Sequence, residues 1–117
     1  MVADTYVRRD WYVDVLDASV DGQYGTSVVL QLLGTWLLLV EGGGGTPDKP
    51  TVTFAPPADP DRVASQLIFR VEHCWATYEL LRGRGAAFLT EPVDRGGEIC
   101  AFFRDPDGHL FEISELT

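Results

Sequence analysis

Few side chains in this sequence have the types and spacing of a catalytic or metal-binding site. The only histidines are His73 and His109, and a site built on two histidines and one carboxylate would need both of them. We expect His73 to open a helix and His109 to follow a turn, so a ligand role is disfavoured for either. Serine hydrolysis is not supported, because no GxSxG segment is present and neither histidine has an evident acidic partner.

The two cysteines, Cys74 and Cys100, are not in a CxxC arrangement and fall in segments that we expect to be a helix and a strand. A disulfide between them is one alternative. No charged-then-apolar leader opens the sequence, however, so export is not supported. We therefore favour two reduced, mostly buried thiols and a cytoplasmic protein.

Glu112 lies in a segment whose apolar pattern is typical of a β-strand. Alternation along a strand places Glu112 on one face with Leu110 and Ser114. We expect Phe111 and Ile113, on the other face, to be buried in the hydrophobic core. The Glu112 carboxylate is then left to face either a cavity or solvent.

Length and charge limit the kinds of partner. The chain of 117 residues and 12.9 kDa is long enough for one domain with its own hydrophobic core. Nine Lys and Arg against 18 Asp and Glu give a net charge of −9, which repels phosphate backbones and anionic lipid. The longest strongly apolar run, residues 28–40, is too short to cross a bilayer. We therefore expect no nucleic-acid partner and no membrane.

Hydrophobic periodicity and turn residues predict the elements that position these side chains. A capping Asp4 and one apolar stripe predict a first helix that ends near Asp17. The stripe consists of Val7, Trp11 and Val15, with Tyr12 and Leu16 beside them. The other predicted elements are strands at 18–21, 27–33 and 35–41, a strand at 66–71, a helix at 73–84 with Cys74, Tyr78 and Leu81 on one face, and strands at 87–93, 98–104 and 109–115.

The middle of the chain has the composition of a connector. Four consecutive glycines are followed by five prolines between residues 42 and 62, which predicts a flexible linker. A phosphate-binding loop is disfavoured there, because no glycine-rich motif opens a helix after it. A lid role for this segment stays open.

The two halves of the sequence repeat one pattern. Residues 34–41 align with residues 108–115, and each segment is a turn glycine followed by a strand that ends in Glu. The element order is likewise duplicated, as helix and three strands, then strand, helix and three strands. Such self-similarity indicates two copies of one unit and mixed sheets with helices on one face.

Three segments, in this order along the chain, resemble the vicinal oxygen chelate superfamily, which includes glyoxalase I, bleomycin-resistance proteins and extradiol dioxygenases. Residues 11–16 are similar to the end of that superfamily's first helix, and residues 80–86 to the end of its second. Residues 101–113 resemble its closing hairpin, in which DPDG precedes a strand carrying Glu. The resemblance implies an α+β fold of two βαβββ modules, whose curled mixed sheets surround a cavity, and often a dimer.

That resemblance implies a single glyoxalase-like domain over residues 1–117, with module one at 1–41, a linker at 42–64 and module two at 65–117. We expect the first strand of module one to be missing, because residues 2–5 already match the junction between strand and helix.

In metal-using members the ligands lie on the first and last strands of each module. The matching positions in module two are Glu112 and Gln66, with Ser65 in place of Gln66 if the register shifts by one. In module one the last-strand position is Leu38, which cannot coordinate a metal. One carboxylate and one amide fall short of the three or four protein ligands of a tight catalytic site. We therefore expect no cofactor, or a weakly held divalent metal.

The same resemblance predicts which side chains line the cavity. These are Trp36, Leu38, Gln66, Ile68, Arg70 and Leu110, together with Glu112 as the catalytic or ligand-binding carboxylate. Arg70 could neutralise Glu112 or hold an anionic substrate, or simply reach water. Trp36 could stack on a planar ligand, although aromatic residues in strands more often only pack.

Three functions are consistent with these residues. The first is a small-molecule-binding protein with an incomplete version of the family metal site, which sequesters a compound or acts as an enzyme without a metal. The second is a metal-dependent lyase, isomerase or dioxygenase whose ligands are completed by a partner chain or by an upstream strand. The third is a degenerate module that serves protein association. An exposed sheet edge also predicts a homodimer.

Overall fold

The computed structural model describes residue 2 and residues 4–117, and Met1 and Ala3 lie outside the described residues. The chain forms two compact units, Met1–Ala58 and Asp59–Thr117. Two helices, one antiparallel sheet and one mixed sheet confirm the predicted α+β class. The predicted single domain, its module and linker boundaries and the cavity between its sheets stay predictions.

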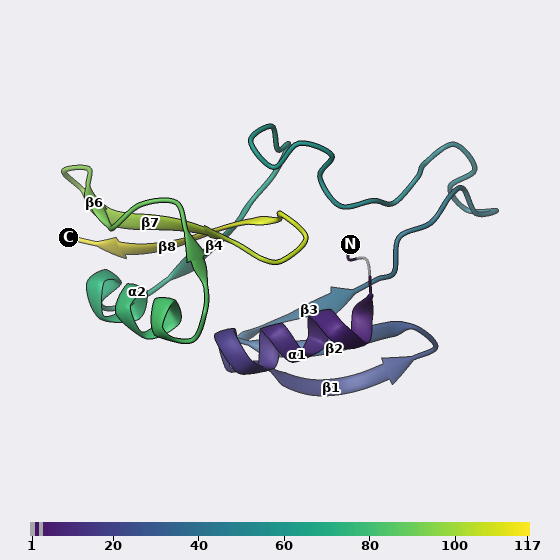
Figure 1. Ribbon diagram of the computed structural model, residues 1–117, viewed down its shortest axis with the longest axis horizontal. Helices are drawn as coiled ribbons and strands as arrows, with labels where there is room; N and C mark the ends of the chain where they lie inside the picture. The colour runs from purple at the N-terminus through teal and green to yellow at the C-terminus, as the bar shows by residue number, and fades with distance from the viewer. Residues whose placement is uncertain (1, 3) are drawn as a thin grey trace. The chain divides into compact units, whose positions relative to one another are not determined.

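The first unit is one helix followed by an antiparallel sheet (Figure 1). Its elements are α1 (Thr5–Leu16), β1 (Ser19–Tyr24), β2 (Ser27–Leu32) and β3 (Thr35–Leu39). Asp4 begins the helix, because its side chain accepts hydrogen bonds from the backbone N–H groups of Tyr6 and Val7. The strands lie in the order β1-β2-β3, and α1 packs mainly on β2. The first strand is longer than the predicted 18–21.

The buried face of α1 is the part of the predicted apolar stripe that carries Tyr12, Val15 and Leu16, which are almost completely buried. Val7 of the same stripe is 56% exposed. Trp11 packs edge-on against Tyr12, with ring centroids 4.9 Å apart. Packing against β2 therefore buries one side of the predicted stripe.

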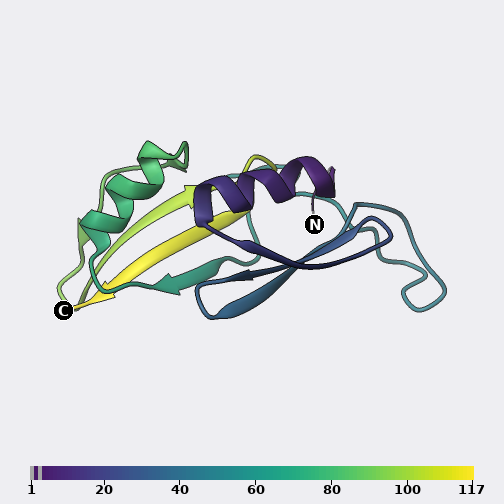
Figure 2. The ribbon, with the colours of Figure 1, turned by 90° about the horizontal axis from the view of Figure 1, so that it is seen from below.

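The second unit builds a mixed five-stranded sheet with one helix. Its elements are β4 (Leu67–Arg70), α2 (Cys74–Gly83), β5 (Ala87–Phe88), β6 (Val93–Asp94), β7 (Glu98–Arg104) and β8 (Leu110–Leu116). The strand order is β4-β8-β7-β5, with β6 also on β7, and β4 runs parallel to β8. Figures 1 and 2 show α2 along one face of this sheet. As predicted, α2 buries Cys74, Tyr78 and Leu81.

A chain of aromatic rings fills the space between α2 and the sheet. Phe111 stacks on Phe103 at 5.2 Å and on Phe69 at 5.7 Å between ring centroids. Phe88 links this stack to Tyr78 of the helix, with centroids 5.0 Å from Phe103 and 4.8 Å from Tyr78. One face of the β4-β8-β7 sheet is therefore committed to the core.

The last strand supplies the cap for α2. His73 at the N-cap makes no side-chain capping bond, and the backbone N–H of Cys74 donates instead to Glu115 Oε1 at 2.6 Å. A carboxylate is a favourable acceptor at a helix N-terminus, where the backbone N–H groups lack partners within the helix.

The predicted strand at 87–93 is wrong, because two short strands replace it. Pairing with β7 runs through Phe88, stops, and resumes at Val93 opposite Cys100. Pro92 lies in the break and has no backbone N–H to donate to a ladder. The strand therefore divides into β5 and β6.

The internal repeat is visible in a backbone hydrogen bond that occurs at equivalent positions in the two units. The backbone N–H of Val2 donates to the carbonyl of Val40 at 3.0 Å, and that of Val71 donates to the carbonyl of Ser114 at 2.9 Å. The two acceptors are related by the offset that aligns 34–41 with 108–115. Val2 is fully buried and forms a parallel bridge with Glu41. The described part of the chain before α1 thus contributes this single bridge, where β4 forms a four-residue ladder in the second unit.

The part of the predicted linker that belongs to the first unit is locally paired. Gly43 and Phe54 form an antiparallel bridge, as do Thr46 and Lys49. Lys49 Nζ lies 4.3 Å from the centroid of the Phe54 ring, a cation–π contact.

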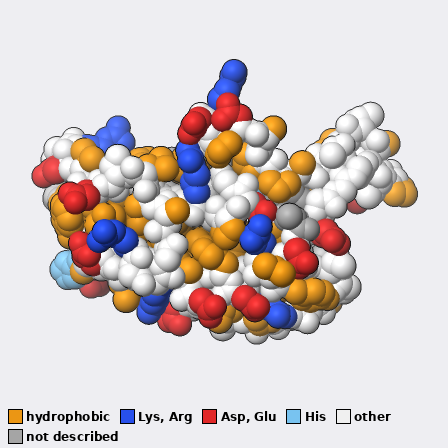
Figure 3. Space-filling view, in the orientation of Figure 1, with side chains coloured by type: hydrophobic (Ala, Val, Ile, Leu, Met, Phe, Trp, Pro, Cys, Tyr) orange, Lys and Arg blue, Asp and Glu red, His pale blue; other side chains and the backbone are white. Residues whose placement is uncertain are grey.

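Charged side chains of both signs occur in small groups on the face shown in Figure 3. Basic side chains there lie among acidic ones and form no continuous basic area. Neither α1 nor α2 has the length and apolar character of a membrane-crossing helix, and the described residues form no other helix.

Candidate functional site

Three strands of the second unit place polar side chains on the sheet face opposite the aromatic core. Glu112 of β8 lies beside Ile68 of β4 and Phe102 of β7. Ser114 lies beside Arg70 on one side and Cys100 on the other. Directly paired residues share a face of a sheet, so these side chains lie together. The remaining members of this face are Glu98, Arg104, Leu110 and Leu116.

Gln66 and Glu112 are joined by a hydrogen bond. Gln66 Nε2 donates to Glu112 Oε2 at 3.2 Å. Glu112 is 5% exposed, although it is a carboxylate in the middle of a strand. The partner is Gln66 rather than Ser65, so the structure has the register in which Gln66 faces Glu112.

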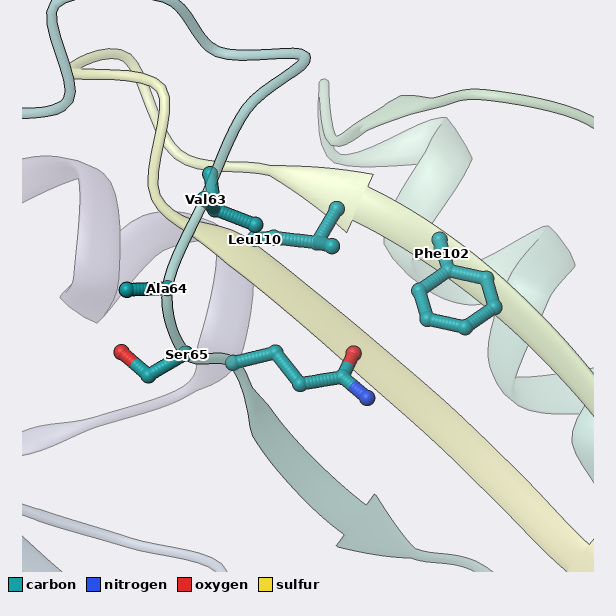
Figure 4. Close-up of a pocket in the computed structure, with 6 residues that line it drawn as sticks. Val63, Ala64, Ser65, Phe102 and Leu110 are labelled. Atoms are coloured by element: carbon teal, nitrogen blue, oxygen red, sulfur yellow. The ribbon is translucent and has the colours of Figure 1, made fainter.

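A pocket of about 290 Å³ opens beside this pair. It is lined by Val63, Ala64, Ser65, Gln66, Phe102 and Leu110. Figure 4 shows Val63, from the segment that leads into β4, next to Leu110 of β8, with Phe102 on the neighbouring strand. An apolar wall with an amide and a hydroxyl at its edge is typical of small-molecule pockets, and the volume is near the lower end of their range.

Arg70 belongs to a second polar group on the same face. Its Nη1 donates to Ser114 Oγ at 2.8 Å, and Ser114 Oγ donates to Glu98 Oε2 at 2.6 Å. Arg70 Nη1 also lies 3.7 Å from Glu98 Oε2, and the Arg70 side chain is 54% exposed. Ser114 therefore links the guanidinium to the carboxylate, while part of Arg70 stays open to solvent.

The two family-type positions alone do not complete a metal site. Gln66 and Glu112 supply one amide and one carboxylate, whereas catalytic metal sites use three protein ligands. The same face brings another donor set together: one ligand atom each from Glu98, Cys100 and Glu112, all within 4.8 Å of one another. Cys100 is 3% exposed and is a free cysteine. The second unit therefore contains side chains that could hold a divalent metal.

The structure places the other predicted site residues as follows. Ile68, Arg70, Gln66, Leu110 and Glu112 lie in the second unit on one face, and Ile68 is 53% exposed. Trp36 and Leu38 belong to β3 of the first unit, where they are 64% and 41% exposed. Their grouping with Glu112 stays a prediction. The His73 side chain is exposed at the start of α2, and the His109 backbone N–H donates to Asp105 Oδ1 at 2.8 Å.

The predictions placed Ser114 on the site face with Glu112 but missed Glu98, Cys100 and Phe102 there. A signal for them is present in the sequence. The DPDG turn closes a hairpin in which Arg104 pairs with Leu110, and counting outward from that pair sets Phe102 opposite Glu112 and Cys100 opposite Ser114. The turn type and loop length thus fix the register.

Comparison with solved structures shows where this fold occurs. An integron cassette protein from the mobile metagenome of V. cholerae is 21% identical, with a TM-score of 0.74 over 99% of this chain and 89% of that one. A glyoxalase/bleomycin resistance protein/dioxygenase from Nocardioides is 20% identical, with a TM-score of 0.72 over 98% and 78%. The fosfomycin resistance protein FosX from Listeria monocytogenes, complexed with Mn(II) and sulfate, is 18% identical, with a TM-score of 0.69 over 99% and 84%.

Because the sequence identities are low, these likenesses establish the fold alone. No curated protein matches the sequence. A family model matches residues 1–113, which is nearly the entire chain. The chain belongs to the Glyoxalase/Bleomycin resistance protein/Dioxygenase superfamily.

Proposed function

We propose that this protein binds a small organic molecule on the sheet face of its second unit, in the pocket beside Gln66 and Glu112. The observation that carries the proposal is a buried carboxylate, Glu112, hydrogen-bonded to Gln66, which lines a partly apolar pocket. Unpaired buried carboxylates are costly, and Glu112 has one hydrogen bond from Gln66 among the described residues. A ligand that donates a hydrogen bond or carries a positive charge would offset the free-energy cost of burying the Glu112 carboxylate.

The pocket residues define the chemistry of that ligand. Val63, Leu110 and the ring of Phe102 would contact an apolar or planar part. Ser65 and Gln66 would hydrogen-bond to a polar edge, and Glu112 would accept a hydrogen bond from the ligand. The compound is then held in a cytoplasmic protein that sequesters it or transforms it without a metal.

Arg70 extends the binding face toward anions. The guanidinium has five N–H donors, one of which is used on Ser114. Its exposed donors could bind a carboxylate or a phosphonate on a ligand that spans from the pocket to β4. The E126Q mutant of FosX from Listeria monocytogenes, which has this fold, was solved in complex with Mn(II) and 1S,2S-dihydroxypropylphosphonic acid, so a protein of this fold can bind a small anionic molecule.

A metal-dependent lyase, isomerase or dioxygenase is the second candidate. The grouping of Glu98 and Cys100 with Glu112 favours it, because Glu98 and Cys100 could add to the two family-type ligands, Gln66 and Glu112. A partner chain in a homodimer could also complete such a site. When bound, the metal would polarise a substrate oxygen, while Gln66 and Arg70 would orient the substrate.

A thermal-shift screen of small molecules, run with and without divalent metals, tests the proposal. A ligand that binds only the folded protein raises its melting temperature according to concentration and affinity. We expect hits in metal-free buffer, and we expect Gln66→Ala to reduce their shifts. Gln23→Ala is the matched control, because Gln23 is an exposed residue of β1 in the first unit.

Equal loss of shift in both variants would place binding elsewhere. Hits that appear only with added metal would favour the metal-dependent enzyme. The third hypothesis, a degenerate module that serves protein association, becomes the better one under two conditions. No compound of any class raises the melting temperature of the wild-type protein, and its mass in solution is that of a complex with another protein.

A further inference from the structure

We infer that the ligand of the pocket beside Gln66 carries an acid group, such as a carboxylate, and that this group binds to Arg104 in place of Asp61. The inference rests on the proposed function and adds to it the chemical class of the ligand. Arg104 has no role in that function as stated above, although it lies on the same sheet face as Glu112.

The strand register places Arg104 beside the pocket. Arg104 pairs directly with Leu110, and the next pair on this face joins Phe102 to Glu112. These four residues form a square on the sheet, and its two diagonals differ in character. Phe102 and Leu110, on one diagonal, line the pocket. Arg104 and Glu112, a base and an acid, lie on the other diagonal, about 7–8 Å apart.

One donor of the Arg104 guanidinium is buried without an acceptor. Among the described residues, Nε of Arg104 is the only buried side-chain nitrogen or oxygen that has no hydrogen-bond partner. An unsatisfied buried donor is destabilising, and more so when the group is charged. Folded proteins leave few buried polar atoms in this state, so the unsatisfied Nε points to an acceptor that binds there.

A neighbouring donor of the same guanidinium is held by an exposed carboxylate. Arg104 Nη2 donates to Asp61 Oδ1, and the Asp61 side chain is 80% exposed. Nε and Nη2 lie side by side and match the two oxygens of one carboxylate, but Asp61 accepts from Nη2 alone. A ligand carboxylate that accepted from both donors would satisfy Nε, and Asp61 would return to solvent at little cost.

Asp61 belongs to the segment that forms one wall of the pocket. Residues 63–66 of this segment line the pocket (Figure 4). Pro60 lies against the hairpin turn, since a Cβ atom added to Gly108 would be 3.3 Å from Pro60 Cβ. Displacement of Asp61 would loosen this wall next to Arg104 and give a ligand in the pocket access to the buried Nε.

Arg70 is less well placed to bind an acid in this pocket. On the site face, Arg104 lies in the row of Leu110, which lines the pocket, whereas Arg70 lies in the row of Ser114, two rows away. Arg70 Nη1 also already donates to Ser114 Oγ and lies 3.7 Å from Glu98 Oε2. Arg104 is therefore the favoured anchor for an acid group.

These positions define a small molecule with an acid group at one end and an amine or another hydrogen-bond donor at the other. The acid binds to Arg104, the donor end lies at Glu112, and an apolar or planar middle packs on Phe102 and Leu110. The compound 4-(aminomethyl)benzoate has these three parts and serves as the probe. Its methyl ester lacks the acid charge but keeps the ring and the amine.

Calorimetric titration of metal-free full-length protein with the acid and its ester tests the inference. We expect the acid to bind at least about tenfold more tightly than the ester, because only the acid forms charge-assisted hydrogen bonds with Arg104. Arg104→Gln should remove this preference. Arg62→Gln is the matched control for the loss of one positive charge, because Arg62 is exposed and adjoins Asp61 in the sequence.

Asp61→Asn separates ligand binding from a purely structural ion pair. The substitution removes the carboxylate that competes for Arg104, so we expect the acid to bind about threefold more tightly than it does to wild type. Asp21→Asn, at an exposed position of β1, controls for the loss of one negative charge. If the ion pair only held the segment in place, Asp61→Asn and Arg104→Gln would both weaken binding of the acid.

Several outcomes would overturn the inference: no binding of the acid, equal affinity for acid and ester, a preference that survives in Arg104→Gln, or unchanged or weaker binding of the acid to Asp61→Asn. If Arg104→Gln does not fold, which circular dichroism would reveal, Asp61→Asn decides, because its side chain is exposed. Compounds that raise the melting temperature in the thermal-shift screen would still support the proposed function after such a result, so the two fail separately.

Discussion

Gln66 Nε2 donates a hydrogen bond to Glu112 Oε2 across 46 positions of the sequence. This bond joins the segment that leads into β4 to the middle of β8, and its donor residue, Gln66, lines the pocket. A ligand that competes for the Glu112 carboxylate would therefore also release Gln66. Substitutions at either position should alter the same binding event.

Glu112→Gln should abolish ligand-induced stabilisation and weaken the binding of a divalent metal at Gln66 and Glu112. The substitution keeps the shape of the side chain and removes its charge, and Gln66 can still donate to the new amide oxygen. We expect the free energy of unfolding to change by only about 1 kcal/mol. Thermal shifts and dye competition measure the two effects.

Glu91→Gln is the control for the loss of one negative charge, because Glu91 is exposed in the segment between β5 and β6. Unaltered responses to both ligand and metal in Glu112→Gln would remove Glu112 from the site.

Phe103→Ala and Phe102→Ala should differ strongly in stability. Phe103 is fully buried and contacts Phe88 and Phe111, so its truncation should cost about 3–5 kcal/mol. Phe102 points to the opposite face, is partly exposed and lines the pocket. Urea unfolding should show a smaller loss for Phe102→Ala, with a reduced thermal shift by ligands.

Similar losses of stability in the two variants would contradict the assignment of one sheet face to the core and the other to the site.

Stability should fall at alkaline pH because of Cys74. Burial raises the pKa of the Cys74 thiol from 9.0 to about 11, and Cys100, Glu115 and Glu112 add to the increase. The thiol ionises more easily in the unfolded chain, so its contribution is complete below pH 9 and is lost as the pH rises toward 11. Denaturant unfolding between these values should show a steeper decline for wild type than for Cys74→Ala.

Parallel declines in the two proteins would show that Cys74 does not titrate differently in the folded state. Cys100→Ala, measured in the same buffers, shows how much of the effect the second thiol contributes.

The protein should sediment as a homodimer, at about twice the monomer mass of 12.9 kDa. Strand β3 lies at an edge of its sheet, and among the described residues only the Val2–Glu41 bridge pairs beside that edge. Free strand edges favour pairing with a second chain. Trp36 and Leu38 on β3 are also exposed. Sedimentation velocity over a wide concentration range provides the measurement, and a monomer mass at every concentration would count against a dimer.

Local signals predicted most of the elements. The helix over 73–84 and its buried residues followed from apolar spacing, with Gly85 at positive φ after its end. The hairpin of β7 and β8 followed from the DPDG turn. These features depend on residues close together in the sequence, so the pattern alone was sufficient.

Features that depend on distant partners were predicted less well. The predicted apolar stripe of α1 is wider than the face that is buried, and only packing on β2 distinguishes Val7 from Tyr12. The contact of Gln66 with Glu112 depends on the parallel register of β4 and β8. No turn joins these two strands directly, so this pairing was predicted from the family resemblance. Glu98 and Cys100 were overlooked because neither position has a family counterpart among the expected ligands.

The Glu115 cap on α2 has a consequence for the order in which the unit folds. The helix contains ten residues, too few to be stable alone in water, and its first turn depends on a carboxylate 41 positions later. The Cys74 amide can therefore become protected from hydrogen exchange only after β8 has docked. Exchange at this single amide would report the attachment of the final strand. The amide of Arg84 at the end of the helix donates to the nearby carbonyls of Leu80 and Leu81, so its exchange would report formation of the helix itself.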